Sequence, residues 1–126
     1  MARSGALPEM VSEKNKANPE LRRERNSKLR ISISLGGAMA SADIREQLDY
    51  VKEAEKLGVH SVWTVEGWGY DAVTPLAYLA GHTNRIKLGT SIMQISARTP
   101  ANTAMTALSL ANISENRFLL GLGNSG

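Results

Sequence analysis

Three short segments of the chain place small and polar residues directly after apolar runs that are typical of strands. They are Glu66–Gly69, Ser91–Gln94 and Gly123–Gly126. Glycine lets a ligand approach the backbone closely, and carboxylate and amide side chains supply hydrogen-bonding groups at a ligand's edge. These residue types together indicate a rim that binds a flat ligand with polar edges.

Glu66 is the one carboxylate in these three segments. It could act as a general base or accept a hydrogen bond from a ring N–H of a ligand. It could equally cap the following helix or pair with an arginine, because perturbed carboxylates also occur in structural pairs. Trp68 could form the wall of a pocket or pack as an ordinary aromatic side chain. Arg98 could bind an anion, although a structural salt bridge is the favoured interpretation.

Several kinds of chemistry are excluded by the residue types that the sequence lacks. The chain has no Cys, which rules out a thiolate nucleophile, a disulfide framework and a thiolate metal site. Neither His60 nor His82 has a ligand partner at a useful spacing, so we expect no metal site. Ser114 and Ser125 lack the arrangement of His and acid partners that a catalytic triad needs.

The positive charge of the chain is concentrated at its start. Residues 1–30 hold eight Lys and Arg against four Glu, a net charge of +4, whereas the whole chain carries +3. Residues 1–28 are polar and almost free of β-branched and aromatic residues, so we expect a disordered or loosely helical leader. A nucleic-acid partner would have to bind this leader alone and is not favoured. No secretory signal and no apolar run of ~18 residues is present, so we expect a cytoplasmic protein without a membrane partner.

From Leu29 onward, strand-like and helix-like patterns alternate along the chain. Apolar residues at period 2 or in short apolar runs predict strands over 29–35, 61–65, 86–92 and 118–122. Helix signals predict three helices: one from its cap at Asp43 to a stop at Gly58, one from Asp71 to about His82, and one that begins at Thr99-Pro100.

Strands that alternate with helices in this way must be parallel, with right-handed crossovers. An open doubly wound sheet and a (β/α)₈ barrel both fit this order. The first strand runs into L-G-G-A-M-A, which does not match the G-x-G-x-x-G of a dinucleotide-binding sheet, so the barrel is favoured. A complete barrel usually needs ~200–250 residues. We therefore expect residues 29–126 to form the N-terminal half of a (β/α)₈ TIM barrel that is truncated after its fourth strand.

Three longer runs carry a resemblance to a known family. They are W-T-V-E-G-W-G-Y-D-A-V-T-P-L-A-Y-L-A at 63–80, T-N-R-I-K-L-G-T-S-I-M-Q-I-S-A-R-T-P-A at 83–101 and N-R-F-L-L-G-L-G-N-S-G at 116–126. In combination they resemble the bacterial luciferase-like superfamily, and more narrowly the branch that uses the deazaflavin coenzyme F-420. The resemblance covers about residues 29 to 126 and leaves the leader outside it.

The resemblance implies an oxidoreductase or monooxygenase that binds coenzyme F-420, or FMN as the alternative, at the carboxyl ends of the barrel strands. It implies a non-proline cis peptide at Ser91–Ile92, whose bulge supports the cofactor ring for hydride transfer. It assigns contacts with the cofactor to six residues: Ser91, Ile92, Gln94, Gly123, Asn124 and Ser125. Glu66 is the candidate catalytic residue, and Gly67 and Trp68 are the candidates for the substrate pocket.

The sequence departs from the family pattern at two places. Related deazaflavin dehydrogenases often carry His where Gly67 stands, so a His acid–base mechanism is not implied. Glu115-Asn116 replaces a frequent Gly-Gly before the fourth strand, and Asn tolerates the left-handed conformation that this turn requires.

The resemblance also implies that the phosphate of the cofactor binds to later strands of the barrel, which would follow Gly126. We expect the full-length form to be a homo-oligomer and residues 29–126 alone to be inactive, weakly stable and prone to associate. A non-catalytic module that binds a cofactor or a partner chain is the alternative function.

Overall fold

The computed structural model describes residues 29–36, 43–67 and 69–124. Along the chain the elements are β1 (Ser32–Ser34), α3 (Ile44–Lys56), β2 (Ser61–Thr64), α4 (Val73–Ala80), β3 (Lys87–Thr90), β4 (Met93–Gln94), α5 (Pro100–Ile113), β5 (Phe118–Leu119) and β6 (Leu122–Gly123). The predicted leader at 1–28, Trp68 and Ser125 lie outside the described residues.

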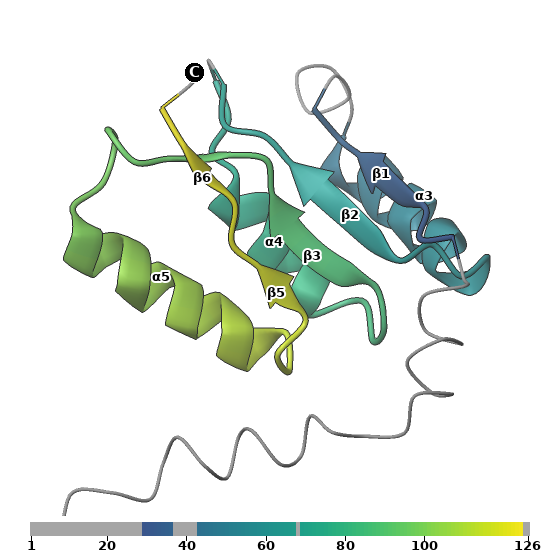
Figure 1. Cartoon of the computed structure of the whole chain (residues 1–126). Helices are drawn as coiled ribbons and strands as arrows, with labels where there is room; N and C mark the ends of the chain where they lie inside the picture. The colour runs from purple at the N-terminus through teal and green to yellow at the C-terminus, as the bar shows by residue number, and fades with distance from the viewer. Residues whose placement is uncertain (1–28, 37–42, 68, 125–126) are drawn as a thin grey trace, which may run out of the picture.

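The strands form one parallel sheet with a short second ladder beyond its end (Figure 1). The main sheet has the order β1-β2-β3-β5, and β4 pairs with β6 in parallel. Helices α3 and α4 connect the first three strands, and α5 connects β4 to β5. The predicted α/β class with parallel strands and helical crossovers is therefore confirmed.

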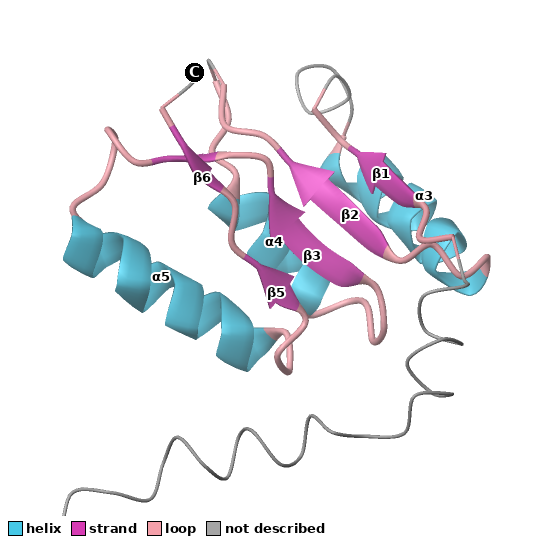
Figure 2. Ribbon diagram, in the orientation of Figure 1, coloured by secondary structure: helices cyan, strands magenta, loops and turns pink. Residues whose placement is uncertain are grey.

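The three helices of the described residues pack on one face of the sheet (Figure 2). Side chains from α3, α4 and α5 meet those of the strands in a single apolar core, whose buried members are Leu35, Leu48, Val51, Val62, Leu76, Leu79, Ala80, Ile86, Leu88 and Leu110. Alternate residues of the strands point to the other face, which carries Ser32, Ser34 and Ser61 beside Trp63 and Gly89. This polar face lies opposite the helix layer, as the interior of a barrel does.

The predicted ends of α3 and the predicted start of α5 are confirmed by the local structure at these positions. Asp43 accepts a hydrogen bond from the backbone N–H of Arg45 at 2.9 Å, and Thr99 accepts one from Asn102 at 3.2 Å. Gly58 ends α3 with a φ of +85°, which glycine adopts without steric cost. Pro100 is the first residue of α5, where its missing N–H costs nothing.

The second helix is shorter than predicted. α4 begins at Val73, but Asp71 still caps it, because Asp71 Oδ1 accepts from the N–H groups of Val73 and Thr74, each at 2.7 Å. Its last residue is Ala80 rather than His82. The ring of His82 bonds the carbonyl oxygen of Tyr78 at 2.8 Å, which satisfies a carbonyl of the last turn.

The third and fourth strands are each interrupted, and the prediction of two continuous strands was wrong. The chain leaves the main ladder after Thr90 and resumes pairing at Met93, and it leaves after Leu119 and resumes at Leu122. A side chain fills the gap, because Thr90 Oγ1 donates to the carbonyl of Gly121 at 2.9 Å and accepts from its N–H at 3.0 Å. Period-2 alternation alone does not reveal a side chain that replaces a ladder bond.

The amino ends of the strands are held by two charged side chains that bind backbone groups. Glu55 Oε1 accepts from three consecutive amides, those of Asn84, Arg85 and Ile86, at 2.6–2.9 Å. Burial raises the pKa of Glu55, but these hydrogen bonds outweigh it and hold the pKa below its ordinary value. The carboxylate therefore stays ionised and ties α3 to the start of β3.

Arg117 is buried just before β5, and its four hydrogen bonds all go to neutral oxygen atoms. Its guanidinium donates to the carbonyls of Ala80, Thr83 and Ile86 and to the hydroxyl of Thr83, at 2.9–3.0 Å. A planar fork of N–H donors suits such a set of acceptors. Arg117 thus joins the loop after α4 to the start of the fourth strand.

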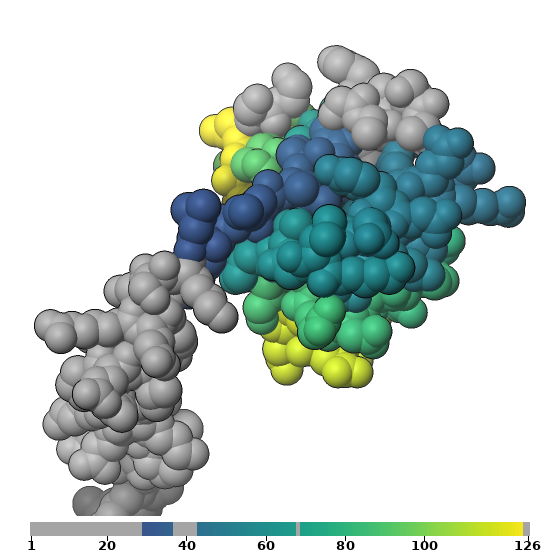
Figure 3. Space-filling view, turned by 90° about the vertical axis from the view of Figure 1, so that its right-hand side faces the viewer, coloured from purple at the N-terminus to yellow at the C-terminus, as the bar shows by residue number. Residues whose placement is uncertain are grey.

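The edge of the sheet at β1 is open to the surroundings. Figure 3, which views the molecule from this side, shows the dark blue residues of the β1 segment at the surface beside α3. Ser32 and Ser34 are exposed, and Ile31 just before them is 58% exposed. Within the described part of the chain, no helix is long and apolar enough to cross a membrane.

Candidate functional site

The second ladder brings two of the three segments singled out from the sequence into contact. β4 and β6 pair in parallel, with Met93 opposite Leu122 and Gln94 opposite Gly123. The N–H of Ile95 donates to the carbonyl of Gly123 at 3.0 Å, which extends the ladder by one residue. The carboxyl ends of the third and fourth strands therefore form one continuous piece of rim.

The peptide bond between Ser91 and Ile92 is cis, at the position that the family resemblance implies. It lies between β3 and β4, directly after the last ladder bond with β2, in which the N–H of Ser91 donates to the carbonyl of Thr64 at 2.7 Å. The side chain of Ile92 lies against Gly123, where an added Cβ would be 3.2–3.4 Å from its carbons. Ser91, Ile92 and Gly123 are thus neighbours in space.

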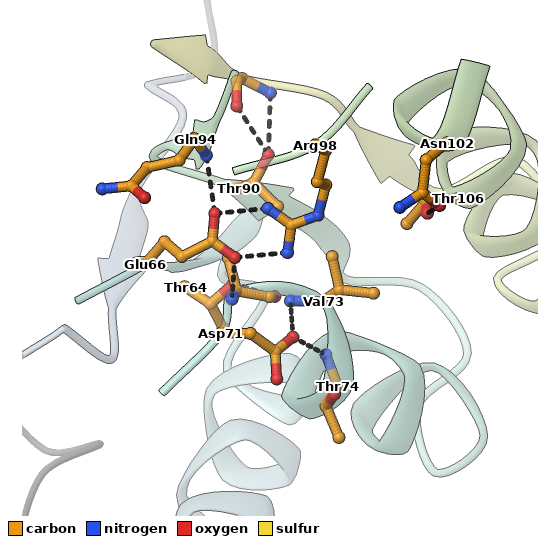
Figure 4. A network of polar contacts seen from close by, with 12 residues as sticks. Thr64, Glu66, Asp71, Val73, Thr74, Thr90, Gln94, Arg98, Asn102 and Thr106 are labelled. Atoms are coloured by element: carbon orange, nitrogen blue, oxygen red, sulfur yellow. Dashed lines mark hydrogen bonds and ion pairs between the residues drawn. The ribbon is translucent and has the colours of Figure 1, made fainter. Parts of the chain in front are cut away.

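Glu66 binds both the rim and the next helix through its carboxylate (Figure 4). Oε2 accepts from the N–H of Gln94 at 2.6 Å and from Arg98 Nη1 at 2.7 Å. Oε1 accepts from Arg98 Nη2 at 2.5 Å and, over a longer 3.4 Å, from the N–H of Ala72. Of the alternatives that the sequence left open, the contacts show the arginine pair together with a bond to the start of α4.

The electrostatics of this pair favour the charged form of both residues. The hydrogen bond from Arg98 lowers the pKa of Glu66, and the N–H groups of Gln94 and Ala72 lower it further against the opposing effect of burial. The pKa of Arg98 is raised chiefly by its hydrogen bond to Glu66. The side chains are only 10% and 14% exposed respectively, so water screens their interaction weakly.

The positive charge of Arg98 also attracts a second carboxylate, that of Asp71. Burial raises the pKa of Asp71, but its hydrogen bonds with Thr74 and Val73 and the charge of Arg98 lower it more. Asp71 belongs to the segment before α4, which Thr64 also holds through a buried 2.7 Å hydrogen bond to the carbonyl of Ala72. The ends of β2 and β4 and the start of α4 therefore meet around one arginine.

A shallow, open cavity of about 330 Å³ lies on the polar face of the sheet, along β1 and beside the carboxyl ends of β2 and β3. Its lining residues are Ser32, Ile33, Ser34, Trp63 and Ser91. This volume is near the lower end of the roughly 300–1,000 Å³ that ligand pockets occupy. Ser91 links the cavity to the rim, because it belongs to the cis peptide that separates β3 from β4.

Trp63 forms one wall of this cavity, and sequence reasoning did not single it out as a site residue. Its ring lies over Gly89, where an added Cβ would come within 2.4 Å of the indole carbons. Its Nε1 donates to Ser61 Oγ at 3.0 Å, and Ser61 Oγ bonds Ser32 Oγ at 2.7 Å. A glycine inside a predicted strand signals a close neighbour, but only the register of the ladder shows that the neighbour of Gly89 is Trp63.

A larger cavity of about 590 Å³ lies outside the sheet, between the starts of α3 and α4. Two helix-capping carboxylates, Asp43 and Asp71, and two aromatic rings, Tyr70 and Tyr78, contribute to its lining. The backbones of Gly67 and Tyr70 exchange two hydrogen bonds of 3.1 Å, and Tyr70 contributes to the lining of this cavity. Gly67 itself has open space where a side chain would lie.

The structure thus gathers five of the predicted site residues at one place. Glu66, Ser91, Ile92, Gln94 and Gly123 converge at the carboxyl ends of the strands. Asn124 follows directly after β6 and is exposed. Within the residues that the structure describes, no three His, Cys, Asp or Glu side chains gather in a way that could hold a metal ion.

Comparisons with known proteins agree with this fold. The model of the luciferase-like monooxygenase family matches residues 28–126. A protein of Mycobacterium tuberculosis that carries the name of a coenzyme F-420-dependent oxidoreductase is 44% identical over 103 residues, which make up 82% of this chain and 29% of that protein. The chain therefore belongs to the luciferase-like monooxygenase family.

Two solved structures support the same assignment. A monooxygenase from Streptomyces bottropensis has a TM-score of 0.70 and 29% identity, over 78% of this chain and 34% of that one. The coenzyme F-420-dependent tetrahydromethanopterin reductase from Methanopyrus kandleri has a TM-score of 0.70 and 26% identity, over 79% of this chain and 28% of that one. The chain thus spans about a third or less of the length of the relatives it matches.

Proposed function

We propose that this chain supplies the first part of the cofactor site of an oxidoreductase that uses coenzyme F-420, with FMN as the alternative cofactor. The convergence of Ser91–Ile92, Gln94 and Gly123 at one rim is the observation that carries the proposal, since the family resemblance assigns all of them to the cofactor. The name of the mycobacterial relative favours the deazaflavin over FMN.

The rim offers the contacts that a flat heteroaromatic ring requires. Ile92 presents an apolar side chain beside Gly123, which has no side chain to obstruct a ligand. The side chains of Gln94 and Asn124 bring amide groups that can hydrogen-bond the polar edge of the ring. We include Ser125 and, for the substrate pocket, Gly67 and Trp68 in the same proposal, on the resemblance alone.

The bound cofactor would supply hydride transfer, and the protein would supply orientation and exclusion of water. Trp63 and the serines of the adjacent cavity would hold the ring or its substrate above the polar face of the sheet. Glu66 is poorly suited to proton transfer, because its oxygens accept from Arg98, Gln94 and Ala72 and its pKa is lowered. We propose that it serves the site without exchanging a proton.

An equilibrium titration separates the two cofactors. The protein made from the whole reading frame is mixed with F-420 or FMN, and the emission of the cofactor and of the tryptophans is followed. We expect saturable quenching by F-420 and a weaker response to FMN. A Trp63→Phe variant identifies how much of the tryptophan signal comes from the cavity wall. Binding of neither cofactor would contradict the proposal and favour a non-catalytic interaction module.

A further inference from the structure

We infer that Glu66 and Arg98 are positioning residues of the rim, which they serve by fixing the backbone of β4 through the amide of Gln94. The inference rests on the proposed function and gives these two residues a role other than acid–base catalysis. Its basis is the way in which one carboxylate oxygen serves two donors at once, the N–H of Gln94 at 2.6 Å and Arg98 Nη1 at 2.7 Å.

The carboxylate of Glu66 takes the place of a ladder bond that β4 lacks. Up to Thr90 the third strand pairs with β2, and the N–H of Ser91 still donates to the carbonyl of Thr64. Beyond the cis peptide, β4 pairs with β6 alone. The bond from the N–H of Gln94 to Glu66 is therefore the connection between β4 and the end of β2 at this level of the rim.

Arg98 fixes the orientation of that carboxylate. Its two terminal nitrogens bind the two oxygens of Glu66, which is a fork-to-fork geometry that allows little rotation. Arg98 lies in the loop that leads from β4 to α5, four residues after Gln94. Its ion pair with Glu66 therefore also holds this loop against the end of β2. Low exposure of both side chains limits their exchange with water. A carboxylate held in this way presents a fixed acceptor to the amide of Gln94.

The position of β4 matters to a ligand because it sets the surface that the ligand would meet. Gln94 is the ladder partner of Gly123, and the N–H of Ile95 donates to the carbonyl of Gly123. Ile92, two residues earlier, packs against Gly123. Release of the Gln94 amide would therefore loosen Ile92 and Gly123 together. The expected consequence is weaker cofactor binding in a protein that is still folded.

The test compares Glu66→Gln and Arg98→Met with the control Glu53→Gln. Glu53 pairs with Lys56 at 3.0 Å on the exposed surface of α3, so the control removes an ion pair that touches no part of the rim. Two quantities are measured on the protein made from the whole reading frame, the hydrogen-exchange rate of the Gln94 amide and the dissociation constant for F-420. Circular dichroism establishes that each variant is folded at the temperature used.

We expect both rim variants to exchange the Gln94 amide at least about tenfold faster and to bind F-420 about tenfold more weakly, with no change in the control. Unchanged exchange at Gln94 in folded Glu66→Gln would overturn the inference, and so would faster exchange with an unchanged dissociation constant. If Glu66→Gln does not fold, Arg98→Lys, which keeps the charge without the fork, is measured instead.

The same experiment separates this inference from the proposed function. If the unmodified protein binds neither F-420 nor FMN, the proposed function fails, and the exchange rate of Gln94 still decides whether the pair fixes β4. If the unmodified protein binds F-420 and the rim variants bind it equally well, the proposed function stands and the positioning role is wrong.

Discussion

The carboxylate of Glu66 accepts hydrogen bonds from Arg98, Gln94 and Ala72, which come from two separate segments of the chain. Its sequence position, directly after a strand, is one where barrel enzymes place catalytic groups. The contacts nevertheless engage both oxygens of the carboxylate. The chemistry of such a position is decided by donors about 30 residues away in sequence, which local patterns do not reveal.

The lowered pKa of Glu66 predicts a pH-dependent stability. A carboxyl whose pKa is depressed on folding stabilises the folded state above its ordinary value of 4.5 and loses this contribution as pH falls through the folded value. We expect Glu66→Gln to lower the free energy of unfolding by about 2–3 kcal/mol at pH 7. The difference should shrink as pH falls below 4.5. Urea unfolding at a series of pH values measures it, and a constant difference would refute the explanation.

Arg117 should be among the side chains whose loss is most destabilising. Arg117→Met leaves buried carbonyls of Ala80, Thr83 and Ile86 without their donor, and we expect a loss of about 2–4 kcal/mol in the free energy of unfolding. The free energy of unfolding of Arg117→Lys should lie between those of Arg117→Met and the unmodified protein, because lysine keeps the charge but cannot reach all the acceptors. Urea unfolding at pH 7 measures both variants. Equal stability of Arg117→Met and the unmodified protein would show that water replaces these hydrogen bonds.

Among the elements, the contact between β2 and β3 depends on one glycine. In Gly89→Ala the new Cβ would lie 2.4 Å from the indole of Trp63, so the ring must move. We expect a loss of about 1–3 kcal/mol in the free energy of unfolding and a shift of the Trp63 emission. Gly81→Ala is the matched control, because its Cβ would meet only the carbonyl of Tyr78 at 3.7 Å.

A second substitution tests the cause of this destabilisation. Trp63→Leu removes the ring that the new Cβ would meet, so the double variant with Gly89→Ala should be less destabilised than the sum of the two single changes. Urea unfolding of the four proteins measures the coupling. Strict additivity would mean that Trp63 and Gly89 do not interact in the folded state.

The elements differ in how well local sequence predicts them. Caps and stops such as Asp43, Gly58 and Thr99-Pro100 act on their immediate neighbours, and they were predicted correctly. The breaks after Thr90 and Leu119 arise from one side chain that binds the backbone of Gly121, 31 residues away. Such a replacement of ladder bonds leaves no periodic signal in the sequence. The cis peptide was predicted only because the run around Ser91–Ile92 resembles a known family.

At the scale of the whole molecule, α5 presents an apolar surface away from the core. Its 14 residues include no charged side chain, and Met105 and Leu108 are 60% and 72% exposed. The outer surface of α3, by contrast, carries several charged side chains, among them Glu53 and Lys56. Contiguous exposed apolar side chains commonly mark a surface that associates. We propose this surface of α5 as the site of the self-association that is expected of the full-length form.

Substitution on α5 tests this surface. We expect the double variant Met105→Lys, Leu108→Lys to raise the monomeric fraction of the protein, as measured by sedimentation velocity over a range of concentrations. Leu57→Lys is the control, since Leu57 is 78% exposed at the end of α3 and lies among charged residues. An equal change of the monomeric fraction in the α5 variant and the control would show that α5 is not the associating surface. A protein that is monomeric at every concentration would show the same.

The class of fold was predictable from the whole chain because the alternation of strands and helices allows few topologies. The pattern of elements fitted both a barrel and an open sheet, and the lack of G-x-G-x-x-G after the first strand favoured the barrel. The resemblance of three sequence runs to a known family then supported the same fold. The site was predictable in part, since the carboxyl ends of parallel strands share one edge of a sheet. The cavity wall at Trp63 was missed, because its role depends on the register between β2 and β3.

The location of the cofactor on the rim is tested most directly by mapping backbone amide shifts in an NMR titration with coenzyme F-420. The account predicts that the amides of Gln94, Gly123 and Asn124 shift in proportion to saturation. The amides of Asn84, Arg85 and Ile86, which Glu55 binds near the opposite end of the strands, should not move. Shifts confined to the amides of Asn84, Arg85 and Ile86 would contradict the location of the cofactor on the rim. Saturable binding with no shift at Gln94, Gly123 or Asn124 would contradict it as well.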